Sequence, residues 1–128
     1  MPNRPKILIV DDQASTRTLI AEALAGDRDV VVLQASDGAG AHRIMQENRP
    51  DVIVCDVQMQ PVDGLSFLKK LRTDKDPALQ RIPVIIMTTT ATRDVVAAAR
   101  QSGATSILAK PVSIAMLKAR LDAALKGS

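Results

Sequence analysis

The sequence predicts an α/β fold in which five parallel strands form a doubly wound sheet, a (βα)5 arrangement. Five short runs are apolar without polar alternation, which is typical of strands buried on both faces of a parallel sheet. Each run is followed by a segment with helical spacing, and the connections are short, so we expect right-handed crossovers with helices on both faces. The 128 residues suit a single domain, 1–128, with a core at about 6–125.

The five strands are expected where β-branched and aliphatic residues run together. The first run ends at Asp11-Asp12 and the third ends at Asp56, so both strands finish in carboxylates. In chain order the runs are Lys6–Val10, Val30–Ala35, Val52–Cys55, Val84–Met87 and Ser106–Ala109.

Helices are expected between the strands, because apolar residues recur there at helical spacing. The first opens at Asp12 or Gln13 and ends at Gly26, with an inner face of Leu19, Ile20, Ala23 and Leu24. The others are expected at 39–48, 64–72, 92–102 and from Ser113, with a last inner stripe of Ile114, Leu117, Leu121 and Leu125. The segment 73–81, which contains Pro77, is predicted to be a polar loop.

Composition excludes several classes of function. The net charge of +3 comes without a long basic run, and Phe67 is the single aromatic residue, so nucleic-acid binding by base stacking is not expected. Cys55 lies within a predicted strand and is expected to be a buried, reduced thiol. No apolar stretch reaches membrane-spanning length and no signal peptide is evident, so we expect a cytoplasmic protein without membrane insertion.

Chemistry-bearing residues gather at the strand ends. Parallel strands place their carboxyl ends along one edge, where ligands bind in open α/β sheets. The residues expected at this edge are Asp11, Asp12, Ser36, Asp37, Asp56, Thr88 and Lys110. Each one alone has an ordinary structural explanation, such as a helix cap or a loop lysine. Their common position favours a site.

The cluster suits phosphoryl transfer. Three neighbouring carboxylates repel unless a cation binds or their pKa values rise. Oxygen ligands suit Mg²⁺, whereas an ammonium and a hydroxyl suit phosphoryl oxygens. An aspartate can itself be the nucleophile, which gives an aspartyl phosphate.

The sequence resembles the receiver domain of two-component response regulators, the CheY-like family with a flavodoxin-like fold. The resemblance extends over about 6–125 and is carried by a set of short motifs. These are Leu-Ile-Val-Asp-Asp at 8–12, Asp-Val-Ile-Val-Cys-Asp at 51–56, Met59, Asp63-Gly64, 83–88, Gly103-Ala104 and Lys110-Pro111.

The resemblance implies a role for each matching residue. Asp56 would be the phosphoacceptor, Thr88 would bond the phosphoryl group after activation, and Lys110 would pair with phosphoryl oxygens. Mg²⁺ would be held by Asp11, Asp12, Asp56 and the backbone carbonyl of Gln58. The Lys110–Pro111 bond is expected to be cis.

Three positions depart from the family pattern. Ile107 stands where the family usually has an aromatic switch residue, so a rotating ring cannot transmit the signal. The loop reads Met59-Gln60-Pro61 rather than Met-Pro, with proline one place later. Gln58 and Thr90, at the positions that tune dephosphorylation in the family, are both neutral.

The resemblance also implies partners. A histidine kinase or a histidine phosphotransfer protein would donate the phosphoryl group to a monomeric switch. The surface of 92–102, 106–109 and 113–126 would contact a downstream protein. Its basic residues, Arg93, Arg100, Lys118, Arg120 and Lys126, suggest an acidic partner, although they also fit a merely solvated surface.

Several alternatives remain open at this stage. The switch could serve chemotaxis, act as a phosphorelay intermediate, or be a phosphate sink, and the chain could be a receiver excised from a longer regulator. A Mg²⁺-dependent phosphatase of similar fold is disfavoured, because no second histidine and no large insertion are present to build its pocket. A flavin or nucleotide binder would need a Gly- or Ser/Thr-rich loop where Asp11-Asp12-Gln13 stands. The intact acidic and basic set also disfavours a pseudo-receiver. The protein is thus expected to catalyse only its own phosphorylation and dephosphorylation.

Overall fold

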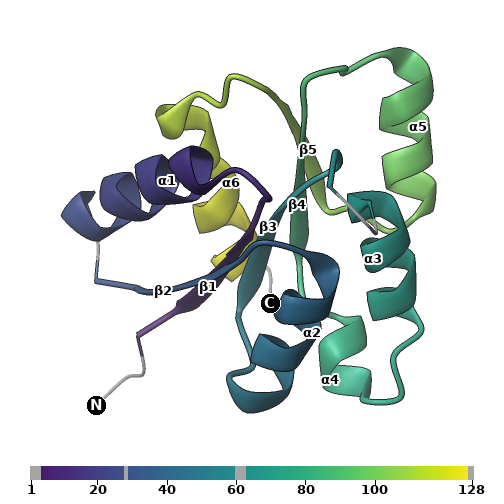
Figure 1. Ribbon diagram of the computed structural model, residues 1–128, viewed down its shortest axis with the longest axis horizontal. Coiled ribbons are helices and arrows are strands. Elements are labelled where there is room, and N and C mark those ends of the chain that lie inside the picture. The colour runs from purple at the N-terminus through teal and green to yellow at the C-terminus, as the bar shows by residue number, and fades with distance from the viewer. Residues whose placement is uncertain (1–3, 28, 60–62, 127–128) are drawn as a thin grey trace.

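The computed structural model describes residues 4–27, 29–59 and 63–126 (Figure 1). The strands are β1 (Lys6–Val10), β2 (Val31–Ala35), β3 (Val52–Asp56), β4 (Val84–Thr88) and β5 (Ser106–Ala109). The helices are α1 (Ala14–Asp27), α2 (Gly38–Glu47), α3 (Gly64–Arg72), α4 (Pro77–Gln80), α5 (Arg93–Gln101) and α6 (Ile114–Lys126). None of these helices is long and apolar enough to cross a bilayer.

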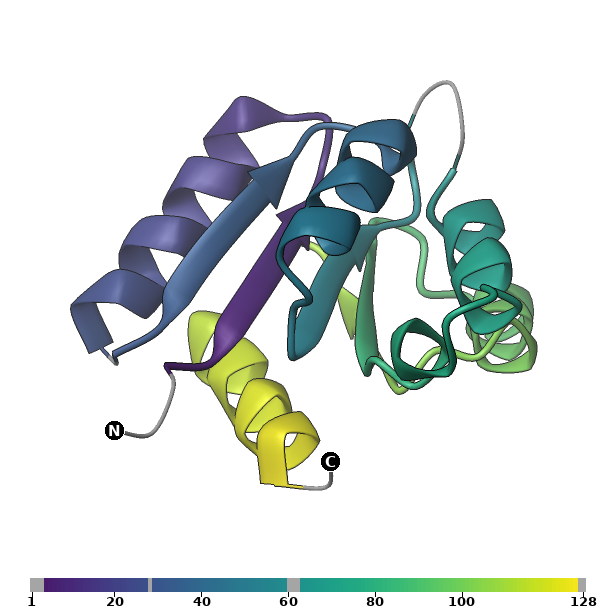
Figure 2. The same cartoon turned by 90° about the horizontal axis from the view of Figure 1, so that it is seen from below.

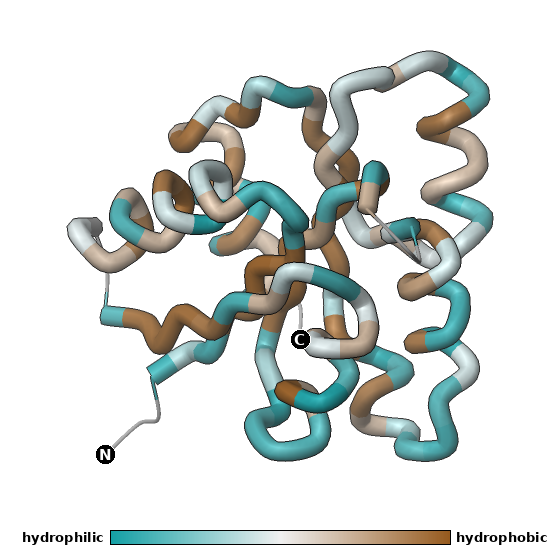
Figure 3. The backbone as a smooth tube through the Cα atoms, in the orientation of Figure 1, coloured by the Kyte–Doolittle hydropathy of each residue, from teal (hydrophilic) through white to brown (hydrophobic). Residues whose placement is uncertain are grey.

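The strands form one parallel sheet in the order β2-β1-β3-β4-β5, which confirms the predicted doubly wound architecture. β3 and β4 are buried along their whole length, as their unbroken apolar runs indicate. β5 lies at one edge of the sheet, next to β4. Figure 3 shows the apolar strands in the interior and polar segments around them.

Helices cover both faces of the sheet (Figure 2), and buried apolar residues form one layer on each face. Alternate strand residues point to opposite faces, so Ile53 and Val54 belong to different layers. On one face α2, α3 and α4 cover the layer that contains Met45, Leu68 and Leu79. On the other face α1 and α6 supply Ile20, Leu24, Leu117, Leu121 and Ala124.

The side chains of Asp37 and Ser113 cap two of the helices. The Asp37 carboxylate accepts a hydrogen bond from the Gly40 backbone N–H at 2.7 Å and begins α2. The Ser113 hydroxyl accepts from the Met116 N–H at 3.3 Å at the start of α6. These bonds satisfy backbone donors that have no partner inside the helix.

The segment 73–81 was predicted wrongly as a loop. It contains the short helix α4, which Asp76 caps by accepting from the Ala78 N–H at 2.9 Å, with Pro77 in the first turn. Aspartate followed by proline is a helix-start signal, because proline lacks the N–H that would be unsatisfied there. Leu79 then packs into the core.

The inner face of α1 was also predicted partly wrongly. Ile20 and Leu24 are buried, but Leu19 is 61% exposed. One helical residue turns the side-chain direction by about 100°, so Leu19 points away from the sheet that Ile20 contacts. The helix also continues through Gly26 to Asp27 rather than ending at Gly26.

Candidate functional site

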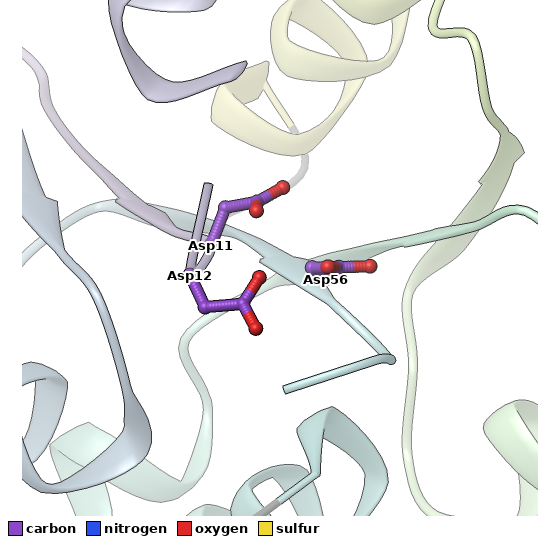
Figure 4. A group of neighbouring side chains, drawn as sticks. All are labelled: Asp11, Asp12 and Asp56. Atoms are coloured by element: carbon purple, nitrogen blue, oxygen red, sulfur yellow. The ribbon is translucent and has the colours of Figure 1, made fainter. Parts of the chain in front are cut away.

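The carboxyl ends of β1 and β3 bring three carboxylates together. Oxygen atoms of Asp11, Asp12 and Asp56 all lie within 4.8 Å of one another. Figure 4 shows Asp11 and Asp12 directly after β1, beside Asp56 at the end of β3. Asp11 and Asp56 are buried, whereas Asp12 is exposed. The grouping that the sequence predicts at this edge is therefore present.

Asp11 is fixed through all four of its polar atoms. Its N–H donates to the Ala35 carbonyl at 3.1 Å, and its own carbonyl accepts from Arg17 Nη1 at 2.7 Å. One carboxylate oxygen accepts from the Gln13 N–H at 2.8 Å, and the other accepts from Lys110 Nζ at 2.9 Å. Complete hydrogen bonding explains how a fully buried carboxylate is tolerated.

Lys110 connects the two buried carboxylates. Its Nζ lies 2.9 Å from Asp11 Oδ2 and 3.3 Å from Asp56 Oδ2. Burial alone would lower the pKa of Lys110, but the hydrogen bond to Asp11 and the charges of both carboxylates outweigh it and raise the pKa. The ammonium group therefore stays charged at neutral pH. The peptide bond between Lys110 and Pro111 is cis, as expected.

The folded protein disfavours the ionised form of the Asp56 carboxyl. Burial and the neighbouring charge of Asp11 raise its pKa, while Lys110 and a 3.3 Å hydrogen bond from the Gln58 N–H oppose that rise. The pKa of Asp56 is higher in the folded protein than in the unfolded protein, so ionisation of this carboxyl favours unfolding. The free energy of unfolding therefore falls as pH rises from the unfolded-state pKa through the folded-state pKa. The penalty is absent below the unfolded-state pKa and grows as the pH rises above it.

Replacing Asp56 with asparagine is therefore expected to increase the free energy of unfolding at pH 7 by about 1 kcal/mol. Urea denaturation without divalent cations measures the change, with the exposed Asp12→Asn as the control that shifts less. The gain should vanish near pH 3, where the carboxyl is neutral in both states. A destabilised Asp56→Asn protein at pH 7 would contradict this account.

Thr88 and Gln58 complete the edge. Thr88 is 1% exposed, and its hydroxyl oxygen accepts a hydrogen bond from the Thr90 N–H at 3.0 Å. That bond leaves the hydroxyl proton available for another acceptor. The Gln58 side-chain oxygen lies 3.5 Å from the Thr89 N–H, which brings the loops after β3 and β4 together. Gln60 and Pro61, where the family pattern is broken, lie outside the described residues.

The donor set fits a hard divalent cation. It consists only of carboxylate oxygens, one of them on the exposed Asp12, and Mg²⁺ takes one or two carboxylates together with waters. Asp11, Asp12 and Asp56 are the residues that would hold it. Such an ion would relieve the repulsion that raises the pKa of Asp56.

Cys55 is confirmed as a core residue and is fully buried beside Asp56. Burial, followed by the charge of Asp56, raises the pKa of its thiol far above the ordinary range. Since only the thiolate is nucleophilic, we expect no alkylation by iodoacetamide in the native protein and complete alkylation in urea. Intact mass gives both results, and native-state alkylation at the rate of an exposed thiol would contradict the prediction.

Arg17 is the site residue that the sequence reasoning missed. It lies in the first turn of α1, and its guanidinium binds the Asp11 carbonyl, so it braces the loop that carries two of the carboxylates. The sequence gives no signal for this contact, because the partner is a backbone carbonyl, which every residue type offers.

The fold and the site together define a doubly wound α/β protein with an acidic centre at the carboxyl edge of its sheet. A family model described as the response regulator receiver domain matches residues 7–122, and the chain belongs to that family.

Named relatives agree with this assignment. "Probable chemotaxis protein CheY" of Rhizobium etli is 36% identical over 118 residues, which are 92% of this chain and 90% of the relative. The "Protein-glutamate methylesterase/protein-glutamine glutaminase 3" of Rhodopseudomonas palustris is 41% identical over 113 residues, but only 30% of its length is matched. Its name therefore carries no activity over to this chain.

Solved structures agree as well. The chemotaxis response regulator CheY4 of Vibrio cholerae superposes with a TM-score of 0.86 at 30% identity, covering 96% of this chain and 100% of that one. The receiver domain of the Francisella response regulator 1452 gives a TM-score of 0.87 at 31% identity and covers 96% of this chain and 98% of that one.

Proposed function

We propose that this protein is a signalling switch that accepts a phosphoryl group on Asp56 from a histidine kinase or a histidine phosphotransfer protein. The observation that carries the proposal is the position of Asp56, with Lys110 Nζ at 3.3 Å and two more carboxylates beside it. The donor would be a phosphohistidine. An Asp56 oxygen attacks the phosphorus, the P–O bond forms as the P–N bond breaks, and the imidazole leaves with its bonding pair and takes up a proton.

The residues around Asp56 have distinct tasks in this transfer. Lys110 stays charged and neutralises phosphoryl oxygens. Thr88 can donate its hydroxyl proton to the new phosphoryl group while it still accepts from Thr90. Mg²⁺, bound by the three aspartates, would neutralise charge on the transferring group.

The output is proposed to be a change in the surface formed by α5, β5 and α6. Thr88 is the last residue of β4, and the chain continues from it to α5. Because β4 also pairs directly with β5, a shift of Thr88 toward a phosphoryl group would displace α5 and β5. With an aliphatic Ile107 in β5, the change must be carried by loop and helix displacement. The name of the Rhizobium etli relative supports chemotaxis as the setting.

The test is intact mass after incubation with acetyl phosphate and Mg²⁺. We expect one phosphoryl adduct that requires Mg²⁺, is prevented by a chelator and is absent from Asp56→Asn. Cys55→Ala is the matched control, because it changes the adjacent residue and should keep the adduct. If a folded protein gave no adduct with acetyl phosphate or with phosphorylated histidine kinases, the proposal would be wrong.

A further inference from the structure

A hollow of about 290 Å³ lies between α2 and α3, which are neighbours on one face of the sheet (Figure 1). Its floor is apolar and consists of Met45 from α2 with Phe67 and Leu71 from α3, each at most 5% exposed. Pockets for small molecules begin at about 300 Å³ and are mostly lined by apolar and aromatic side chains. The hollow therefore has the size and the floor to hold a small ligand with an apolar body.

The charges around this floor are unevenly paired. A second hollow of about 610 Å³ continues from the first toward α4 and shares Lys70 with it. Arg49 and Asp76 line the second hollow and form an ion pair at 2.7 Å, so their charges offset each other. Lys70 and Lys75 also line it, and within the described part of the chain neither lysine has an ion-pair partner.

The other polar side chains of the smaller hollow already have partners. Asp74 supplies the one carboxylate among its described lining residues, and an oxygen of that carboxylate accepts from the Asp76 N–H at 2.9 Å. The His42 ring lies 3.2 Å from the Gln46 side-chain nitrogen. The exposed ammonium group of Lys70 is thus the charge beside the apolar floor that is left for a ligand.

We propose that this hollow binds a small amphipathic carboxylate. Its apolar body would cover Met45, Phe67 and Leu71, and its carboxylate would pair with Lys70. Burial of apolar ligand surface supplies most of the affinity, and a charge-assisted hydrogen bond from the ammonium group selects an anion. The proposal goes beyond the phosphoryl switch, because no residue of the acidic site lines the hollow.

The size of the hollow favours a small molecule over a helical protein segment. A helix with side chains is about 10 Å wide and rises 5.4 Å per turn, so a single turn occupies roughly 400 Å³. That volume exceeds the space between α2 and α3. Among small molecules, an uncharged one would gain nothing from Lys70, and a cationic one would be repelled by it.

The experiment is a ¹H–¹⁵N NMR titration with octanoate, and with octanol and octylamine as probes of equal chain length. We expect octanoate to bind about tenfold more tightly than octanol and octylamine to bind least, with the largest shift changes in α2 and α3. Lys70→Gln should reduce octanoate binding to the level of octanol. Lys69→Gln is the matched control, because it removes the same charge from the adjacent exposed position, which lines neither hollow, and should change little.

Gly38→Ala tests the apolar part of the hollow. A methyl group at Gly38 would lie 3.5 Å from Phe67 Cδ1, which is an ordinary van der Waals contact, so alanine should be tolerated and should narrow the hollow. We expect octanoate and octanol to bind severalfold more weakly, with the ratio of their affinities retained. Gly26→Ala adds a methyl group with nothing within 4 Å and should leave binding unchanged.

Three results would overturn the proposal. The first is equal binding of octanoate and octanol to the wild type, and the second is an effect of Lys69→Gln as large as that of Lys70→Gln. The third is an acidic, leucine-rich peptide that binds more tightly than octanoate and requires Lys70, since the occupant would then be a protein partner.

Asp56→Asn separates this proposal from the proposed function. The variant cannot accept a phosphoryl group on residue 56, yet it should bind octanoate as the wild type does. Loss of octanoate binding in Asp56→Asn would place the probe at the acidic edge and would also overturn the proposal.

Discussion

Gly64→Ala is expected to lower the free energy of unfolding by about 3 kcal/mol and to reduce phosphorylation of Asp56 sharply. A methyl group at Gly64 would overlap the Asp56 carbonyl oxygen and lie 2.9 Å from the Asp56 carbonyl carbon and 3.0 Å from Val57 Cα. These are backbone atoms at the end of β3, so no side chain can rotate away. Overpacking of this kind usually costs 1–3 kcal/mol, and backbone obstruction places it at about the upper end.

The effect on the site follows from the same contact. Relief of the overlap must shift the end of β3 or the start of α3, and with either shift Asp56 moves relative to Lys110. Urea denaturation followed by circular dichroism measures stability, since the chain has no Trp or Tyr for fluorescence. Gly26→Ala is the control, because nothing lies within 4 Å of the added methyl, and helix propensity predicts a gain of about 0.5–1 kcal/mol. An unchanged Gly64→Ala protein would show that the strand end yields without cost.

Arg72→Met is expected to destabilise the protein by about 2–4 kcal/mol. The Arg72 guanidinium donates to the carbonyls of Gly103, Gln80 and Ile82 at 2.6 to 3.1 Å. Methionine fills similar space but leaves three carbonyl oxygens without this donor. Because burial already lowers the pKa of Arg72, the gain from these bonds must exceed a desolvation cost.

Two further variants test this explanation. Arg72→Lys retains the charge but lacks the planar set of donors, so it should recover only part of the loss. Arg81→Met removes an exposed arginine nearby and should change stability by less than about 0.5 kcal/mol. If Arg72→Lys matched the wild type, charge rather than the geometry of the three hydrogen bonds would explain the role of Arg72.

The sequence predicted the strands, the sheet type and the acidic edge because all three follow from local patterns. An unbroken apolar run such as Val52–Cys55 favours a strand that is buried on both faces, as in a parallel sheet. Once the strands are parallel, their carboxyl ends lie along one edge, which could be predicted without the strand order. Asp11, Asp12 and Asp56 come within 4.8 Å because β1 pairs with β3, and that pairing is known only from the fold.

Arg72 and Arg17 could not be found in the same way. Their partners are backbone carbonyls, six residues away for Arg17 and up to 31 residues away for Arg72, and every residue type offers the same carbonyl. In the sequence, Arg72 is one of several basic residues at the end of a predicted helix. Only the fold brings the Gly103 carbonyl within hydrogen-bonding distance of its guanidinium group.

The edge position of β5 has a mechanical consequence. α6 is anchored on one face of the sheet by Leu117 and Leu121, both fully buried, whereas α5 lies toward the other face and buries only Ala99 (Figure 2). One helix is thus a fixed reference, and the other can be displaced at little cost in buried apolar surface. A partner protein that contacts both α5 and α6 would bind with an affinity that depends on the distance between the two helices, and therefore on how far α5 has moved.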